Sequence, residues 1–273
     1  MIENPLKFKH PCFSNSGCDV SRMHVAVAPK CNIKCGFCKP TVSPCAHGCA
    51  PGLASKVLSP AEAVAWVREV REKKGVDIKI VGIAGPGEPL CNLETFQTLA
   101  MLREAFPEIH LCLSTNGLLL PQSVALIKSL GVETLTVTMN AFTVKTGAEI
   151  YEHVMGITGE EGVKILLECQ KEGVIKAVEA GFVVKINSVY VPGINDDEIP
   201  LIAKWGDEHG ANIHNILPLI PREKFANLKS PTREQVDTVR ETSGAFMEQF
   251  LQCRHCRADA VIVADSNKLN RSR

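Results

Sequence analysis

The chain has 273 residues, a formal net charge of zero, 45% hydrophobic residues and 22% charged residues, as expected of a soluble globular protein with one substantial core. The lack of a basic surplus and the aromatic share of 5% argue against a partner that is nucleic acid or an anionic membrane. The N-terminus has no apolar core of signal-peptide length and no stretch reaches membrane-spanning length, so we expect a cytoplasmic protein.

Apolar strand-like runs alternate with amphipathic helical stretches along the first half of the chain. A strand is predicted over His24–Ala28, and a loop rich in Cys, Gly and Pro extends from there to about Leu58. Ser59-Pro60-Ala61-Glu62 indicates a helix start, with Ser as N-cap, Pro at the first position and Glu able to bond back to the cap. The next expected elements are strand Ile78–Ala84, helix Leu93–Ala105, strand Ile109–Ser114, helix Pro121–Leu130 and strand Thr134–Met139.

The second half continues the alternation after an irregular segment at Thr143–Gly159. A long helix is expected over Glu160–Ala180, with Gly173 as a candidate break. It is followed by strand Phe182–Val189, helix Asp196–His209, strand Asn212–Leu217 and helix Pro231–Leu251. The strands are nearly continuous apolar runs, which is typical of parallel strands buried on both faces. We therefore predict one α/β domain over residues 1–273, a partial (β/α)6 TIM-like barrel over about 20–220, with cysteine-bearing extensions at 1–19 and 221–273.

The cysteines are unevenly distributed. Of the 12 cysteines, seven fall within residues 12–49 and two more, Cys253 and Cys256, form a pair near the C-terminus. A reducing cytoplasm disfavours structural disulfides, so clustered cysteines indicate metal or redox chemistry. Cys91 and Cys169 have no such neighbours, and we expect them to be structural.

The most informative motif is Cys31-Asn-Ile-Lys-Cys35-Gly-Phe-Cys38, which directly follows the first predicted strand. Three thiolates at this spacing can hold a [4Fe–4S] cluster and leave one iron without a protein ligand. That open iron could bind the amino and carboxylate groups of S-adenosylmethionine. Two alternatives are a thioredoxin-like Cys35/Cys38 pair, which predicts a much smaller fold, and a zinc site formed by those two with Cys253 and Cys256.

Three further motifs follow predicted strands and would lie at one end of the barrel. Gly85-Pro86-Gly87-Glu88 could hold the ammonium of a ligand through Glu88. Ser114-Thr115-Asn116-Gly117 could contact a ribose or carboxylate through Asn116. The segment from Asn187 to Asn195 could hold an adenine through backbone contacts around Gly193 and Ile194. Each motif alone is a common glycine-bearing turn.

These segments resemble the radical-SAM superfamily and, within it, the NifB family of nitrogenase cofactor maturases. The resemblance extends from about His10 to Ala260, through HPC, RMHVAVAPKCNIKCGFC, AGPGEPL, LCLSTNGL, TVTMN, NSVYVPGIND, HNILPLI and CRHCRADAV. It implies a lyase-class enzyme that fuses two [4Fe–4S] clusters into an eight-iron cofactor precursor. One S-adenosylmethionine supplies the methyl carbon of the central carbide, and another supplies the 5′-deoxyadenosyl radical that removes hydrogen from it.

The resemblance also implies residue roles. Cys31, Cys35 and Cys38 would hold the radical cluster. Cys12, His24 and Cys112 would hold one substrate cluster, and Cys45, Cys253 and Cys256 the other, so the protein would bind three [4Fe–4S] clusters in all. The residues expected around S-adenosylmethionine are Gly85, Gly87, Glu88, Asn116, Asn140, Asn187, Gly193 and Ile194. Without the resemblance, His24 and Cys112 could equally be core residues of their strands.

One segment departs from the family. NifB proteins usually have Cys-x-x-Glu-Ser-Arg-Pro after the radical motif, whereas this chain has Cys45-Ala-His-Gly-Cys49-Ala-Pro51. The third ligand of the second substrate cluster is therefore either Cys45 or Cys49. The resemblance further implies protein partners: an iron–sulfur cluster donor, a downstream cofactor carrier or scaffold, and a reductant such as ferredoxin or flavodoxin. A radical-SAM enzyme acting on a peptide or small molecule, with auxiliary electron-transfer clusters, is the alternative function.

Overall fold

The computed structural model describes residues 10–15, 20–45, 47–48, 50–253 and 255–264. Its main sheet has the strand order β10-β9-β7-β6-β5-β1-β11, in which all neighbours from β10 to β1 are parallel and β11 is antiparallel to β1. The strands are β1 (Ser21–His24), β5 (Ile78–Ile83), β6 (His110–Thr115), β7 (Val132–Thr138), β9 (Val183–Tyr190), β10 (Ile213–Pro218) and β11 (Val261–Ile262).

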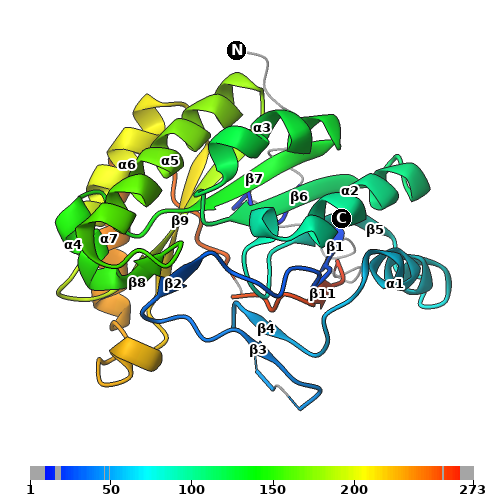
Figure 1. The fold of residues 1–273 in the computed structure, drawn as a ribbon, viewed down its shortest axis with the longest axis horizontal. Coiled ribbons are helices and arrows are strands. Elements are labelled where there is room, and N and C mark those ends of the chain that lie inside the picture. Colours follow the sequence, from blue (N-terminus) through cyan, green and yellow to red (C-terminus); the bar gives the residue numbers. More distant parts are fainter. Residues whose placement is uncertain (1–9, 16–19, 46, 49, 254, 265–273) are drawn as a thin grey trace, which may run out of the picture.

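Helices follow the parallel strands and cover the convex face of the curled sheet (Figure 1). They are α1 (Pro60–Glu72), α2 (Leu93–Ala105), α3 (Leu120–Ser129), α5 (Gly159–Glu179), α6 (Glu198–Glu208) and α7 (Arg233–Gly244). The largest apolar cluster lies between sheet and helices and includes Met23, Val67, Leu102, Leu135 and Ile186. Six strand–helix units in a curved parallel sheet confirm the predicted partial TIM-like barrel. They also exclude the small thioredoxin-like fold.

Local sequence signals explain where several helices begin and how they pack. Ser59 caps α1 and forms the predicted capping box with Glu62, and Thr232 caps α7 in the same way with Gln235. Gly173 does not break α5, contrary to the prediction. A Cβ at this position would lie 2.8 Å from Cβ of Leu120, so the glycine lets α5 and α3 approach closely.

Two other predicted boundaries were wrong. Strand β1 ends at His24 instead of starting there, although Val25 and Ala28 still donate backbone hydrogen bonds to Gly82 and Gly85. Helix α7 ends at Gly244, seven residues before its predicted end. The chain beyond it bonds to the backbone of β10: His214 donates to Glu248 and accepts from Phe250.

The segment predicted to be irregular, Thr143–Gly159, contains α4 (Val144–Ile150) and β8 (Tyr151–Val154). Strand β8 pairs antiparallel with β2 (Ile33–Cys35), inside the three-cysteine motif. A second small pair, β3 (Thr41–Val42) with β4 (Leu53–Ala54), lies below the main sheet in Figure 1. Two short 3-10 helices, η1 (Pro89–Cys91) and η2 (Glu223–Phe225), complete the elements of the described residues.

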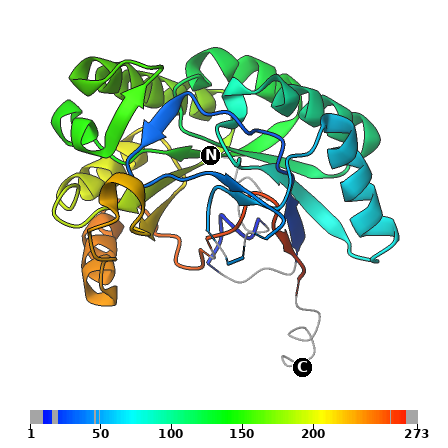
Figure 2. The ribbon, with the colours of Figure 1, turned by 60° about the horizontal axis from the view of Figure 1, so that its bottom comes forward.

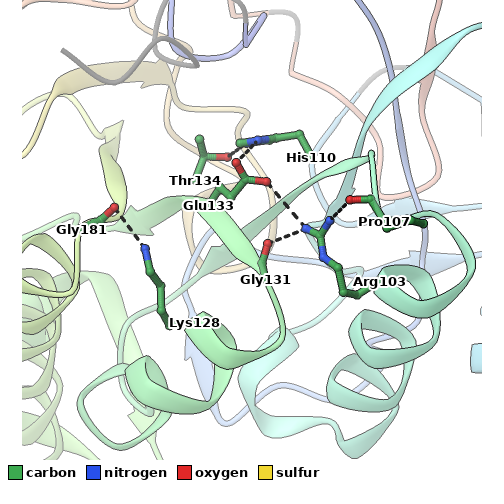
Figure 3. A network of polar contacts seen from close by, with 8 residues as sticks. All are labelled: Arg103, Pro107, His110, Lys128, Gly131, Glu133, Thr134 and Gly181. Carbon is green, nitrogen blue, oxygen red and sulfur yellow. Dashed lines mark hydrogen bonds and ion pairs between the residues drawn. The ribbon is translucent and has the colours of Figure 1, made fainter. Parts of the chain in front are cut away.

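A polar network fastens the amino-terminal ends of β6 and β7 (Figure 3). Arg103 from α2 donates to the carbonyls of Pro107 at 2.6 Å and Gly131 at 2.8 Å. His110 at the start of β6 lies 3.1 Å from both Glu133 and Thr134. These contacts tie the helix-to-strand loops to the sheet and leave the opposite, carboxyl-terminal ends to form the site. In the described part of the chain, no helix has the length and apolarity needed to cross a membrane.

Candidate functional site

A cavity of about 920 Å³ opens on the concave side of the half-barrel. Figure 2 shows the N-terminal and C-terminal segments of the described chain running side by side beneath the sheet, where they form part of its wall. The cavity brings together twelve of the predicted site residues: Cys12, His24, Cys31, Cys35, Cys38, Gly87, Glu88, Cys112, Asn116, Asn187, Cys253 and Cys256. Gly85, Asn140, Gly193, Ile194 and Cys45 do not line it, and Cys49 lies outside the described residues.

The three-cysteine loop is held by short-range contacts. The amide of Cys38 donates to the Cys35 carbonyl at 3.0 Å, and Lys34 Nζ donates to the Cys38 carbonyl at 2.8 Å. Gly36 donates to the Ile150 carbonyl, and a Cβ on Gly36 would come within 3.1 Å of that oxygen. Phe37 stacks on Phe225 with ring centroids 6.4 Å apart. The cysteine side chains are therefore carried by a loop packed against β8 and η2.

Burial raises the pKa of all three thiols in this loop, to about 11 for Cys31. The neighbouring sulfurs contribute to the increase for Cys31 and Cys35, which indicates that the groups lie close to one another. Such thiols ionise readily only when a metal compensates their charge. The donor set therefore fits an iron–sulfur cluster held by three cysteines.

The Gly85–Glu88 loop supports the backbone that leads into this motif. Gly87 donates to the Ala28 carbonyl at 2.6 Å and Glu88 donates to the Lys30 carbonyl at 2.8 Å. A Cβ on Gly87 would lie only 2.3 Å from the Lys30 oxygen, so no larger residue fits there without movement. Gly87 thus acts by close backbone approach to the segment before Cys31.

The Glu88 carboxyl group is buried at the cavity wall. It accepts hydrogen bonds from the Thr115 hydroxyl at 2.6 Å, the Asn116 amide at 2.6 Å and the Leu90 amide at 3.0 Å. Burial raises the pKa of Glu88 to about 7, against the lowering effect of these three donors. A carboxylate has about four acceptor positions, so one remains for a cationic group in the cavity.

The predicted asparagines divide into two groups. Asn116 donates to the Asn32 side chain at 2.7 Å, and Asn187 accepts from Asn215 at 3.0 Å; both line the cavity. Asn140 is instead buried beside Tyr151 and accepts from the Val189 amide at 2.9 Å. Its carbonyl accepts from Asn195, whose side chain also shapes the turn that contains Gly193 and Ile194. These residues hold the turn's conformation in the described structure.

His24 and Cys112 meet across a glycine. The register pairs His24 with Gly82 on β5, and Gly82 with Cys112 on β6. A Cβ on Gly82 would lie 2.5 Å from Cys112 Sγ and 3.0 Å from His24 Cδ2. The two side chains, two strands apart, therefore occupy the space that a side chain at residue 82 would fill.

The hydrogen bonds of His24 define which ring nitrogen could bind a metal. Its Nδ1 lies 3.0 Å from the Arg257 carbonyl, which can only accept, so we assign the proton to Nδ1. Nε2 then carries the lone pair and accepts from Arg22 Nη1 at 2.9 Å. Burial and the Arg22 charge lower the pKa of His24 to about 4, so the ring is neutral at pH 7, as a ligand must be.

The remaining predicted cysteines reach the cavity from the two terminal segments. Phe13 and Phe250 pack in one apolar cluster, against which Cys12 and Cys253 also pack. Lys185 from β9 donates to the Cys12 carbonyl at 3.1 Å and lies over both phenylalanine rings. Cys256 accepts from Arg22 Nη2 at 2.9 Å. Residues far apart in sequence are thus joined at one wall of the cavity.

Several residues at this wall were missed by the sequence reasoning: His10, Arg22, Gly82 and Lys185. His10 is buried and its Nδ1 accepts from the Cys12 amide at 3.1 Å. The sequence offered two signals. A glycine inside the apolar run Ile78–Ala84 indicates close approach of another group, and charged residues at positions 22 and 185 flank or interrupt apolar strands, where a buried charge needs a partner.

The four cysteines of the alternative zinc site do not converge on one point in the described structure. Cys35, Cys38, Cys253 and Cys256 are all described, yet among the described residues no three His, Cys, Asp or Glu side chains converge as single-ion ligands. A zinc ion needs ligands about 2.0–2.3 Å from one point, whereas a cubane cluster spreads its ligands over several irons.

Comparison with known proteins agrees with this geometry. Residues 25–206 match the Radical SAM superfamily, so the chain belongs to that superfamily of enzymes, which use a [4Fe–4S] cluster and S-adenosylmethionine. Among curated proteins, the chain is 43% identical over 267 residues to the FeMo cofactor biosynthesis protein NifB of Methanocaldococcus infernus, covering 95% of this chain and 87% of the relative. Within the superfamily, the chain is a member of the NifB family.

A second curated relative is much longer than this chain, and a solved structure shares its fold at low sequence identity. The NifB protein of Klebsiella pneumoniae is 40% identical, and the match covers 92% of this chain but 56% of that protein. Among solved structures, a radical SAM methyltransferase from Sphaerobacter thermophilus matches with a TM-score of 0.57 at 20% identity, covering 85% of this chain and 65% of that one. The structural match supports the fold alone.

Proposed function

We propose that this chain is a nitrogenase cofactor maturase that fuses two [4Fe–4S] substrate clusters and a carbon from S-adenosylmethionine into an eight-iron precursor. The observation that carries the proposal is the meeting of His24 and Cys112 beside Gly82, in the same cavity as the three-cysteine loop. A radical-SAM enzyme needs that loop only. A neutral imidazole paired with a thiol in the same cavity would supply ligands for a second cluster.

Cys31, Cys35 and Cys38 would hold the radical cluster, which would bind S-adenosylmethionine and supply the electron for its cleavage. Glu88 would accept a hydrogen bond from the methionyl ammonium through its remaining acceptor position. Asn116, whose side chain already contacts Asn32 beside Cys31, would orient the same ligand. Gly85, Asn140, Gly193 and Ile194 would act indirectly, by fixing the loops around the cofactor.

The two substrate sites would share one cavity. Cys12, His24 and Cys112 would hold the first cluster. His24 would bind through Nε2, after Arg22 Nη1, which donates to that nitrogen in this structure, has turned away from it. Cys253 and Cys256 would hold the second, with Cys45 or Cys49 as third ligand. Three-ligand sites and a labile imidazole suit clusters that must leave after fusion.

The product must be transferred to another protein, so we propose a cofactor carrier or scaffold as a downstream partner, and a cluster donor upstream. Cleavage of S-adenosylmethionine needs an electron, for which a ferredoxin or flavodoxin is the expected source. These partners follow from the chemistry of the proposed reaction and from the family.

The test is an iron and product analysis of anaerobically reconstituted protein. About twelve irons per chain are expected for three clusters. After addition of dithionite and S-adenosylmethionine, both 5′-deoxyadenosine and S-adenosylhomocysteine should form, reporting the radical and methyl-transfer reactions. About four irons, with 5′-deoxyadenosine as the sole product, would reject cluster fusion and favour an enzyme acting on a peptide or small molecule.

A further inference from the structure

Arg22 is a buried cation that has no carboxylate partner within the part of the chain that the structure describes. It is 5% exposed and lines the cavity wall. Its contacts are His24 Nε2 and Cys256 Sγ, each at 2.9 Å, and its Nε has no hydrogen-bond partner. None of the ion pairs between described residues includes Arg22.

A guanidinium in such a place has a substantial cost in free energy, because burial of a charge is strongly unfavourable unless an opposite charge compensates it. The two groups it touches, an imidazole nitrogen and a cysteine sulfur, are not carboxylates. The expected compensation is therefore an anion bound in the cavity, and a cubane held by thiolates is one.

The two contacts of Arg22 belong to different proposed substrate sites. His24 lies with Cys112 at Gly82, on the sheet. Cys256 lies with Cys253 on the C-terminal segment. A planar guanidinium can donate in two directions at once, which a lysine ammonium cannot do with the same fixed geometry.

We propose that Arg22 is a positioning residue for cluster fusion: its guanidinium bridges the two substrate clusters, compensates their negative charge and holds them next to each other. This inference rests on the proposed function, since it requires two substrate clusters. Arg22 would thereby couple the binding and the reduction potentials of the two substrate clusters. Hydrogen bonds and positive charge near cluster sulfurs stabilise the reduced form and so raise the potential.

The experiment uses the full chain with Cys31, Cys35 and Cys38 replaced by alanine, so that only the substrate clusters are reconstituted. Arg22→Gln and Arg22→Lys are made in this background. Arg103→Gln is the control, because Arg103 likewise donates two hydrogen bonds, here to the Pro107 and Gly131 carbonyls, but lies in the network at the opposite end of the strands. Iron content, midpoint potentials and the rate of iron loss to a chelator are measured, with circular dichroism of the apo protein as a folding check.

We expect Arg22→Gln to lower the midpoint potentials of both clusters and to accelerate iron loss, while Arg103→Gln changes neither. Arg22→Lys keeps the charge and should restore the potentials, but iron loss should remain faster than in the parent protein. Potentials and iron loss equal to those of the parent would overturn the proposal. If Arg22→Gln does not fold, parent-like iron loss in Arg22→Lys overturns the bridging role. A parent protein that retains no auxiliary iron would instead refute the proposed function.

Discussion

Substitution of Gly82 by alanine tests how His24 and Cys112 come together. The added Cβ would lie 2.5 Å from Cys112 Sγ and 3.0 Å from His24 Cδ2. Because ordinary contacts at such a position are 3.4 Å or more, the sulfur must move by about 1 Å. Overpacking of this kind costs about 1–3 kcal/mol, and alanine recovers about 0.5–1 kcal/mol of backbone entropy in a strand. The net loss of stability should be about 1 kcal/mol.

The larger expected effect is on cluster binding. With the two side chains forced apart, the first substrate cluster loses its ligand geometry, so reconstituted Gly82→Ala should hold about eight irons in place of about twelve. Formation of 5′-deoxyadenosine should persist, because the three-cysteine loop is not touched. Iron analysis, thermal unfolding of the apo protein and product analysis measure the three quantities.

Gly206→Ala provides the matched control. A Cβ on Gly206 would lie 2.6 Å from Ile186 Cδ1 and from Met247 Cε, a similar overlap with the ends of side chains away from the cavity. This variant should lose stability to a comparable or smaller extent and retain all its iron. A Gly82→Ala protein with the full iron content would refute the reasoning that the glycine makes the site.

Glu88→Gln should abolish cleavage of S-adenosylmethionine while leaving the iron content unchanged; normal cleavage would exclude contact with the ammonium. The pKa of Glu88 is raised to about 7 from 4.5, so the folded state binds more protons between these values and stability falls as pH rises from about 4.5 to 7, by about 3 kcal/mol. Urea unfolding of the apo protein should therefore show a smaller decline over this range in Glu88→Gln, and equal slopes would contradict the raised pKa. Cys45→Ala and Cys49→Ala should differ: the variant that loses about four irons identifies the third ligand, and loss in neither would remove both from the second site. Gly131→Ala should lower stability by about 1–3 kcal/mol, because Gly131 has φ +81° and a Cβ would lie 2.4 Å from Arg103 Nε; thermal unfolding measures this, and the iron content should not change.

The parallel barrel was predictable because its strands are apolar runs and its helices have readable starts. Ser59 with Glu62 defined the start of α1, whose buried face consists of Ala63, Val64, Val67 and Val70. Short elements were not predictable. Strands β2 and β8 have three and four residues, and each pairs with a strand far away in the sequence, which a local pattern does not reveal.

The candidate site was predictable where residues are close in sequence and not where strand register brings them together. The spacing of Cys31, Cys35 and Cys38 indicates its chemistry directly. The role of Gly82 depends on its pairing with His24 on one side and Cys112 on the other. That register follows from the packing of the whole sheet. Arg22 was missed for the same reason, since its contact with Cys256 spans 234 residues.

That separation has a consequence for the order of assembly. The wall formed by Arg22, His24 and Cys256 cannot exist until the last of these residues has been synthesised and has closed a loop around nearly the whole barrel. Such long-range closure is slow and entropically unfavourable compared with the formation of local strand–helix units. The barrel can therefore fold first, and metal binding can stabilise the later closure of the C-terminal segment. Cluster delivery would then act on a finished polypeptide, as the step that completes its folding.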